Sequence, residues 1–427
     1  MFSKHFAVMK PLLPSSDHCC GCASCVDACP KKALTLEEDE NSFLNIRVDE
    51  NKCVGCHLCE EQCHLLHPER LQRHDARKVQ PWAGWSTRKE LIEKSASGGI
   101  FAQLAYDFLN PDRTEQHYVY GAALQSDGNV RHIEIASRQQ LSLLLNSKYQ
   151  QSDSQGIYTK VRTRLKEGAV ILFSGVPCQI AALYSFLGSD SALTEKLYTI
   201  EVLCHGVPTQ ALYRTALRVE KAKRIVSYRT KDERGWINNN NRLTYEMQDG
   251  REVTKKKHVY DFLFRAYLEF SFSRKNCFQC PYANISRVSD VTLADFWGWD
   301  KSPRKELYRN HLGISVITPN SPKGEALLQG SRELHLVETS WKEFLPQNPN
   351  FYMPNNHYLF AGADKIHRIQ QMPLWCQKFI FQNGFSNRYL NEAYKRVSNV
   401  FLFFKHRREE AEVKQHLKAT LDYLNES

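Results

Sequence analysis

Strand-like and helix-like hydrophobic patterns alternate along the central part of the chain. Residues 117–125 and 130–137 alternate apolar and polar positions as half-buried strands do, and residues 156–188 read as helix, buried strand, turn and helix. Residues 197–222 repeat the strand, turn and helix. Strands that alternate with helices predict an α/β body with a mostly parallel sheet, in which ligands bind at the carboxyl ends of the strands.

The flanking segments have simpler patterns. Residues 33–52 and 242–256 each predict a β-hairpin, and the second turns at Asp249-Gly250. A small-residue loop at 95–99 leads into an amphipathic helix, whereas the polar residues 68–90 predict a linker. The last hundred residues predict a mostly helical extension.

Charge is distributed unevenly along the 427 residues. The formal net charge is +10, but residues 1–75 hold 8 Lys and Arg against 12 Asp and Glu, a net −4, which leaves +14 for the rest. An acidic first module on a basic body indicates two functional parts. The basic body is compatible with nucleic acid, a membrane surface, an acidic partner or an anionic small molecule, and charge alone does not choose among them.

Basic residues also crowd around the apolar run at 400–404. A basic helix with an apolar face can lie on an anionic membrane, although a helix packed on the body with a solvated charged face explains the pattern more simply. The residues are Arg388, Lys395, Arg396, Lys405, Arg407 and Arg408. The sequence therefore leaves open a peripheral membrane contact.

The chain has 14 cysteines, and their density indicates metal or iron–sulfur binding. The first residues lack the apolar core of a secretory signal, and no run of about 18 apolar residues predicts a spanning helix. We therefore expect a cytoplasmic protein with reduced thiols, and clustered cysteines in such proteins bind metal more often than they pair.

Two cysteine runs near the start repeat the spacing C-x2-C-x2-C-x3-C of bacterial ferredoxins. The first three thiolates of a run surround one [4Fe-4S] cluster, and the fourth reaches the other. The spacing predicts two crossed ligand sets: Cys19, Cys22, Cys25 and Cys63 for one cluster, and Cys53, Cys56, Cys59 and Cys29 for the other. Zinc is the alternative, but it leaves the regular third cysteine of each run unexplained. His64 stands where proline usually closes the second run.

Four cysteines of the body predict a third cluster. Cys178 and Cys204 follow two predicted strands, and Cys277 and Cys280 form a C-x2-C pair. A lone cysteine at a strand end is usually buried filler, but four thiolates together are the number that a [4Fe-4S] cluster needs. Cys20 is interpreted as a small filler beside the first cluster.

Six segments in one order resemble the beta subunits of deazaflavin coenzyme (F-420) hydrogenases and dehydrogenases and their relatives, some of which carry an N-terminal double ferredoxin. They lie within about residues 80–320: SASGGIF, SKYQQS, FSGVPCQ, EVLCHG, YRTKDERGW and CFQCPYANISRVSDVTLADFWG, with Ala294 where glycine is frequent in relatives. Members of this family bind FAD and an iron–sulfur cluster. The resemblance therefore implies that Cys178, Cys204, Cys277 and Cys280 hold a cluster close to a flavin.

The resemblance also implies flavin and substrate residues. Backbone N–H groups at a helix start can hold a phosphate or the polar edge of a flavin, and Lys148 adds a cation. The implied cofactor-binding residues are Ser95, Ser97, Gly98, Gly99, Lys148, Tyr149, Ser152, Gly175 and Pro177. The implied substrate-binding residues are Arg229 and Trp236, and the implied catalytic residues are His205 and Lys231. A plain helix cap, a solvated basic loop and a structural histidine explain the same positions without a cofactor.

The predicted architecture is multidomain, α+β and α/β. It comprises a two-[4Fe-4S] ferredoxin-like domain at 1–75, a central mixed α/β flavin and iron–sulfur domain at 80–330 and a C-terminal helical extension at 331–427. The predicted function is an oxidoreductase in which FAD exchanges hydride with a small molecule or a deazaflavin, while clusters pass electrons to an external carrier such as ferredoxin or to a partner subunit.

Two alternative functions stay open. One is an electron-transfer subunit without a substrate of its own. The other is a non-redox iron–sulfur protein that binds nucleic acid through its basic body, and the lack of a nucleic-acid-binding motif argues against it.

Overall fold

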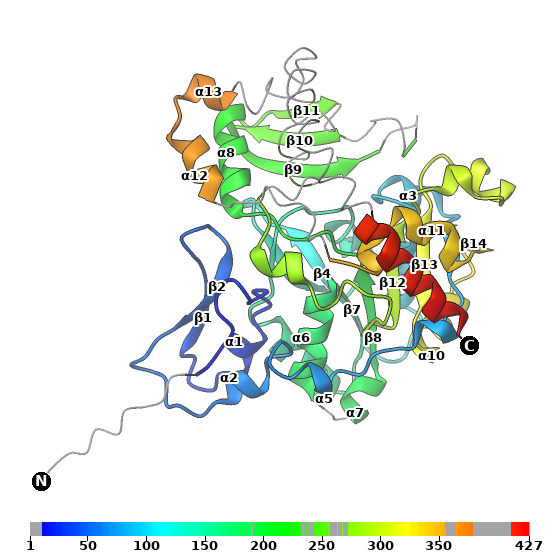
Figure 1. Ribbon diagram of the computed structural model, residues 1–427, viewed down its shortest axis with the longest axis horizontal. Coiled ribbons are helices and arrows are strands. Elements are labelled where there is room, and N and C mark those ends of the chain that lie inside the picture. The colour runs from blue at the N-terminus through cyan, green and yellow to red at the C-terminus, as the bar shows by residue number, and fades with distance from the viewer. Residues whose placement is uncertain are drawn as a thin grey trace, which may run out of the picture.

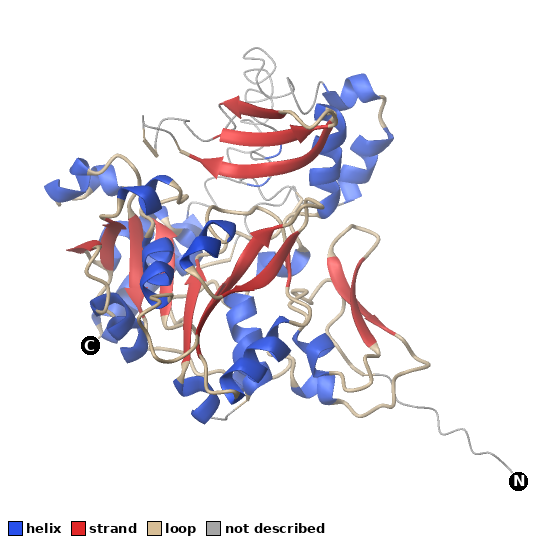
Figure 2. Ribbon diagram, turned by 180° about the vertical axis from the view of Figure 1, so that it is seen from behind, coloured by secondary structure: helices blue, strands red, loops and turns tan. Residues whose placement is uncertain are grey.

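The computed structural model describes residues 11–188, 191–231, 235–236, 242–256, 263, 267, 272–354, 364–378 and 411–426. Over these residues the chain forms a small N-terminal module, a nine-stranded sheet and a three-stranded sheet (Figure 1). Seen from behind, the hairpin of the module stands beside the large sheet and the three-stranded sheet lies above it (Figure 2). No helix among these residues is both long and apolar enough to cross a bilayer.

The N-terminal module consists of a hairpin and two short helices. Its elements are α1 (Ser24–Ala28), β1 (Leu34–Glu38), β2 (Leu44–Val48) and α2 (Leu58–Glu61). β1 and β2 pair antiparallel, as the pattern at 33–52 predicts. The module docks on the body through α1: the Asp27 carboxylate accepts the N–H groups of Gly156 at 2.6 Å and Thr159 at 3.0 Å, and Tyr158 donates to the Cys22 carbonyl at 2.9 Å.

The large sheet has the order β14-β3-β13-β12-β8-β7-β4-β5-β6. Its strands are β3 (Trp82–Ser86), β4 (His117–Leu124), β5 (Val130–Ile135), β6 (Ser152–Asp153), β7 (Val170–Gly175), β8 (Leu197–Val202), β12 (Val291–Asp295), β13 (Ser315–Pro319) and β14 (Leu334–Glu338). The central strands β12, β8, β7 and β4 are parallel neighbours, so their carboxyl ends share one edge.

The prediction of a mostly parallel sheet is wrong on the flanks. β13 runs antiparallel to β12 and β3, β14 runs antiparallel to β3, and β5 runs antiparallel to β4. The chain returns from β12 to β13 through turns rather than through a crossover helix, and such a return leads to an antiparallel neighbour.

Two predicted boundaries also change. Residues 82–86 of the predicted linker form β3 inside the sheet, where the small Ala83, Gly84 and Ser86 are buried against neighbouring strands. β14 belongs to the predicted helical extension but closes the same sheet, so the body continues past residue 330. The C-terminal helix at 411–425 packs with Leu417 and Leu421 against the core near β13, whereas the basic residues at 388–408 lie outside the described residues.

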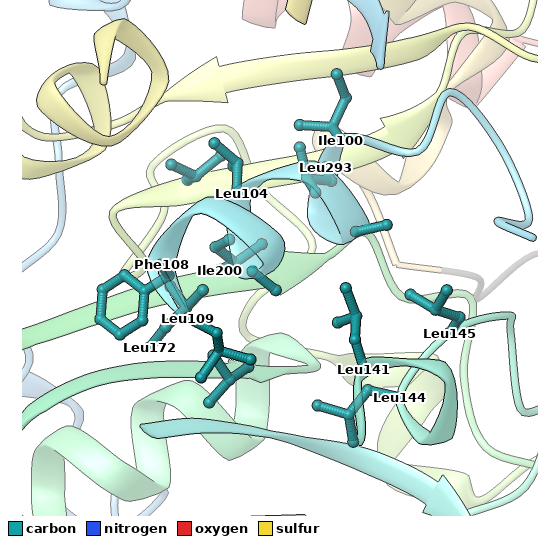
Figure 3. Close-up of a cluster of buried hydrophobic side chains, with 14 of the residues drawn as sticks. Ile100, Leu104, Phe108, Leu109, Leu141, Leu144, Leu145, Leu172, Ile200 and Leu293 are labelled. Atoms are coloured by element: carbon teal, nitrogen blue, oxygen red, sulfur yellow. The ribbon is translucent and has the colours of Figure 1, made fainter. Parts of the chain in front are cut away.

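Helices cover both faces of the sheet because its strands alternate apolar residues between two cores. Leu172 of β7 packs with Leu104 of α4 (Ile100–Phe108) and Leu145 on one face (Figure 3). Ile171 and Phe173 of the same strand pack on the other face against α5 (Ile157–Lys166) and α6 (Pro177–Leu187). The alternation of period two therefore fixes which helix lies on which face.

The three-stranded sheet has the order β11-β10-β9 and packs on α8 (Gln210–Glu220). Its strands are β9 (Ala222–Thr230), β10 (Arg242–Met247) and β11 (Glu252–Lys256), so the hairpin predicted at 242–256 is present. The remaining helices are α3 (Lys89–Glu93), α7 (Ser191–Glu195), α10 (Pro322–Gln329), α11 (Trp341–Phe344), α12 (Asp364–Gln371) and α13 (Leu374–Lys378). Single 3-10 turns are η1 (Pro68–Arg70), η2 (Ala76–Lys78), η3 (Arg138–Leu143), η5 (Lys275–Gln279), η6 (Trp299–Lys301), η7 (Lys305–Arg309), η8 (Leu345–Gln347) and η9 (Pro349–Phe351).

A close approach of α10 to the segment before β12 gives a test of the sheet packing. A Cβ atom at Gly324 would lie 2.1 Å from the Asp290 carbonyl oxygen, so Gly324→Ala must push the helix away. We expect a loss of about 1–3 kcal/mol in the free energy of unfolding, measured with denaturant. Gly330→Ala, whose Cβ would meet its nearest neighbour at 3.2 Å, is the control, and equal losses would show that the close approach is not the cause.

Candidate iron–sulfur and cofactor site

The cysteines of the two runs of the N-terminal module lie near one another. Burial raises the pKa of Cys25, and the nearby thiols of Cys19 and Cys63 raise it further. Burial raises the pKa of Cys59 to about 11, with a further contribution from Cys29. Cys59 also contributes to the raised pKa of Cys25, so the crossed assignment stays a prediction. We call Cys19, Cys22, Cys25 and Cys63 the inner set, and Cys29, Cys53, Cys56 and Cys59 the outer set.

The two sets differ in their access to solvent. The outer set surrounds a cavity that opens at the surface, and Cys56 is exposed. Val54 and Leu58 line the same cavity with 54% and 45% of their side chains exposed. The inner set faces the body, because Cys22 packs against the core formed by α5 and α6. The outer set is thus the one that a partner in solution can approach.

The structure also brings the four body cysteines together. Cys178 is the second residue of α6, after β7, and Cys204 follows β8. Cys277 lies in η5 and Cys280 directly after it. Contact with Cys20 and burial raise the pKa of Cys178, and Cys204 and Cys280 raise it further. Burial raises the pKa of Cys204 to about 12. These four residues, which we call the body set, lie at the carboxyl edge of the central strands.

Cys20 lies between the inner set and the body set. Its sulfur contacts Cys22 and Cys178 and lies 3.5 Å from His64 Nε2, and His64 Nδ1 contacts the Tyr282 hydroxyl. The donor atoms of Cys20, Cys22 and His64 lie within 4.8 Å of one another. Cys20 is therefore more than a filler beside one cluster. The sequence signal for this contact is His64, which stands where proline usually closes a ferredoxin cysteine run. The spacing of the cysteines does not indicate its buried partner Tyr282.

The loop predicted to cradle a flavin is held by the body itself. Gly98 donates its N–H to Ser315 Oγ at 3.2 Å, and Ser97 Oγ donates to the Ile314 carbonyl at 3.1 Å. A Cβ atom at Gly98 would lie 2.5 Å from the Gly84 carbonyl oxygen. Packing between β3 and β13 therefore already explains Gly98, without a ligand. The Ser95 hydroxyl donates a hydrogen bond to the Leu91 carbonyl at 2.7 Å, and Gly99 is the N-cap of α4 with φ 77°.

Lys148 lies in an environment that is unusual for a lysine. Its amine donates to the Leu145 carbonyl at 2.7 Å, and desolvation by burial lowers the pKa of Lys148 to about 7. Among the described residues no carboxylate forms an ion pair with it. Its charge acts on the buried His132, whose pKa burial lowers to about 4. A half-buried amine with no carboxylate partner among the described residues can bind an anionic group that the protein itself does not supply.

The other predicted flavin residues lie near His132 or on the neighbouring aromatic cluster. Ser152 donates its hydroxyl to His132 Nδ1 at 2.7 Å, and His132 Nε2 donates to the Ser174 carbonyl at 3.1 Å. Gly175 ends β7 and Pro177 begins α6, so both lie at the same carboxyl edge. Tyr149 packs on Tyr267 with ring centroids 4.5 Å apart, in the region of β9.

The predicted substrate and catalytic residues are only partly brought together. Lys231 donates its amine to the carbonyls of Ser97, at 2.5 Å, and Leu312. Trp236 is buried and stacks on Trp297 at 5.1 Å, and Trp297 is 40% exposed. His205 follows Cys204 at a half-buried position, whereas the side chain of Arg229 lies outside the described residues.

Two family models match separate segments of the chain. The model described as a 4Fe-4S dicluster domain matches residues 18–65, so the N-terminal module is an iron–sulfur module. The model that describes the C terminus of the coenzyme F420 hydrogenase/dehydrogenase beta subunit matches residues 168–343. That segment belongs to this oxidoreductase family, which confirms the predicted resemblance.

Two individual proteins are similar to parts of the chain. The oxidoreductase UacF of Escherichia coli (strain K12) is 42% identical over 50 residues, which are 12% of this chain and 7% of that protein. A chain of the F420-reducing [NiFe] hydrogenase complex from Methanosarcina barkeri superposes with a TM-score of 0.40 at 15% identity, covering 63% of this chain and 84% of that one. This chain therefore spans only a small part of the length of UacF, and the structural likeness carries no further argument.

The difference in exposure predicts an order of cluster loss. Because Cys56 is exposed and the inner set faces the body, we expect an iron chelator with mild oxidant to remove the outer cluster first. Electron paramagnetic resonance spectra recorded during the treatment would follow the two signals separately. Simultaneous loss would contradict the assignment of inner and outer sets.

Proposed function

We propose that this chain is an iron–sulfur flavoprotein oxidoreductase. FAD exchanges hydride with a small molecule or a deazaflavin, and the clusters pass single electrons between the flavin and an external carrier, which is a ferredoxin or a partner subunit. The observation that carries the proposal is the row of thiols from the exposed Cys56 through the inner set and Cys20 to Cys178. Such a row supports electron transfer from the surface to the carboxyl edge of the sheet.

The body set supports a third cluster in this row. Its four cysteines come from three separate segments and surround one another at the strand ends, where α/β sheets place their ligands. Cys20 contacts both Cys22 and Cys178, so a body cluster would be a direct neighbour of the inner cluster. Clusters that only scaffold the fold have no need to lie next to one another. The closeness of the inner set and the body set therefore favours electron transfer over a scaffolding role.

The flavin is proposed to lie at the same edge, with Lys148 at its anionic part. When bound, FAD converts a two-electron hydride event into single electrons. The chain contributes the Lys148 cation, the start of α4 after Gly99, and an apolar contact at Val202, which is 48% exposed at the end of β8. His205, next to Cys204, is the proposed proton donor at this edge.

An electron-transfer subunit without its own substrate is the second candidate. One predicted catalytic residue and one predicted substrate-binding residue are already engaged within the protein: Lys231 by two backbone carbonyls, and Trp236 by stacking on Trp297. Turnover of a hydride donor by the isolated, FAD-loaded chain with a one-electron acceptor would decide between the two. Absence of turnover, with clusters and FAD in place, would favour the second candidate.

Iron content tests the three ligand sets. Twelve cysteines in three sets predict about twelve iron atoms per chain in protein prepared without oxygen. Cys280→Ser should reduce this to about eight by removing the body cluster, whereas Cys376→Ser, which changes a cysteine outside all sets, should leave it unchanged. About eight iron atoms in the parent would show that the body set holds no cluster, and stoichiometric zinc would overturn all three.

Lys148→Met tests the flavin site. Loss of a charge-assisted hydrogen bond worth about 1.5–3 kcal/mol should weaken FAD binding roughly tenfold to hundredfold and leave the iron content intact. Fluorescence titration measures the affinity. Lys166→Met, which changes an exposed lysine of α5, is the control. Parent-like FAD binding by Lys148→Met would place the flavin elsewhere.

The same variant should be more stable without flavin, because it no longer buries an amine. In the unfolded chain the amine holds its proton up to about pH 10, whereas the folded protein releases it above about pH 7. Between these values the unfolded state binds more protons, so the stability of the flavin-free parent should rise with pH. Unfolding at pH 7 and pH 9 should show a smaller rise for Lys148→Met, and an identical rise would contradict the burial of a neutral amine.

A further inference from the structure

Arg274 is the largest side chain that the body buries completely, and it holds the N-terminal module. It is 1% exposed and lies just before η5. Its Nη1 donates to the Cys19 carbonyl at 3.0 Å and to Asn45 Oδ1 at 2.8 Å. Its Nη2 donates to the Leu44 carbonyl at 2.7 Å and to Gln151 Oε1 at 2.9 Å. Three of these four acceptors belong to the module, so the guanidinium crosses the contact between module and body.

All four acceptors are neutral, which is unusual for a buried cation. Removal of a guanidinium from water is costly unless an opposite charge compensates for it. Arg287 is buried to a similar extent, and its Nε contacts the Glu201 carboxylate. Over the described part of the chain, by contrast, no carboxylate lies within ion-pair distance of Arg274. The Phe43 ring, whose centroid lies 5.1 Å from the guanidinium carbon, stabilises the cation in part but supplies no negative charge.

Two cysteines of different sets lie directly beside Arg274: its Nη1 donates to the Cys19 carbonyl at 3.0 Å, and its own carbonyl accepts the N–H of Cys277 at 3.0 Å. Burial raises the pKa values of Cys19 and Cys277, and the positive charge of Arg274 lowers both in part. Cys19 belongs to the inner set and Cys277 to the body set. Clusters held by four thiolates carry negative charge and gain one more on reduction, and nearby charge is one of the factors that set their potential.

We infer that Arg274 is a positioning residue that serves as the shared counter-charge of the inner and body clusters. It stabilises the reduced form of both clusters and thereby raises both reduction potentials, while its four hydrogen bonds fix the module beside the body. The part that concerns the body cluster rests on the proposed function, whereas the part that concerns the inner cluster needs only the dicluster module. Among its described contacts, Arg274 touches no residue of the outer set.

The test is a redox titration of the iron-loaded full-length chain, followed by electron paramagnetic resonance. Arg274→Gln should lower the potentials of the inner and body clusters and leave that of the outer cluster unchanged. Arg274→Lys keeps the charge but loses the fork of hydrogen bonds, so it should restore most of the shift. Arg214→Gln is the matched control, because Arg214 crosses the same contact to Glu38 and Ser42 at 2.7 Å from an exposed position. It should leave all three potentials unchanged.

A second variant keeps Arg274 in place. Gln151→Glu puts a carboxylate at Nη2 and neutralises the guanidinium, so it should lower the same two potentials even if Arg274→Gln fails to retain iron. An unchanged inner potential in iron-loaded Arg274→Gln or in Gln151→Glu overturns the inference, as does an equal shift in Arg214→Gln. Iron and FAD content of the parent are measured in parallel. About eight iron atoms in the parent would remove the body cluster from the proposal, and the shift in the potential of the inner cluster would remain as its test. Three clusters with no shift in potential would refute the role of Arg274 and leave the proposed function standing.

Discussion

Gathering like-charged ligands in the interior is the constraint on which this structure depends. Thiolates repel one another and lose solvation when buried, and the raised pKa values of Cys19, Cys59 and Cys204 express this cost. Metal coordination offsets the cost only if the ligands come from segments held rigidly in place. The nine-stranded sheet supplies that rigidity for Cys178 and Cys204, and α1 and α2 supply it in the module.

The carboxyl edge of the sheet connects this constraint with chemistry. β7 and β8 end side by side, so the body set and the residues proposed for the flavin share one edge. The module docks on α5 and α6 just beyond that edge, through Asp27 and Tyr158. The docked module and the sheet thus place the outer set, the inner set and the body set one after another from the surface inward. One-electron transfer requires such a row of neighbouring sites.

The spacing of residues along the chain predicted those parts of the site that a single short segment forms. The two cysteine runs determine the dicluster module, and the strand-end positions of Cys178 and Cys204 follow from hydrophobic patterns. The internal strand β3 was missed because small residues such as Ala83 and Gly84 give no alternating pattern. The edge strand β14 was missed because it lies in the segment predicted to be helical. Gly98 was assigned to a ligand, but its neighbours Gly84 and Ser315 come from other strands and are invisible along the chain. Arg274 gave no signal at all, because its partners lie more than a hundred residues away.

The clamp at Arg274 also limits how this protein can be rebuilt from parts. The segment 68–81 joins the module to the body in the chain, and the two are also matched away from that connection, through Leu44, Asn45 and Gln151. A ferredoxin module from another source, joined at this segment, would keep main-chain carbonyls at these positions but lose the Asn45 side-chain acceptor wherever another residue stands there. Interchange of modules therefore requires transplanting the contact surface together with the clusters, and the two parts form one structural unit despite their separate folds.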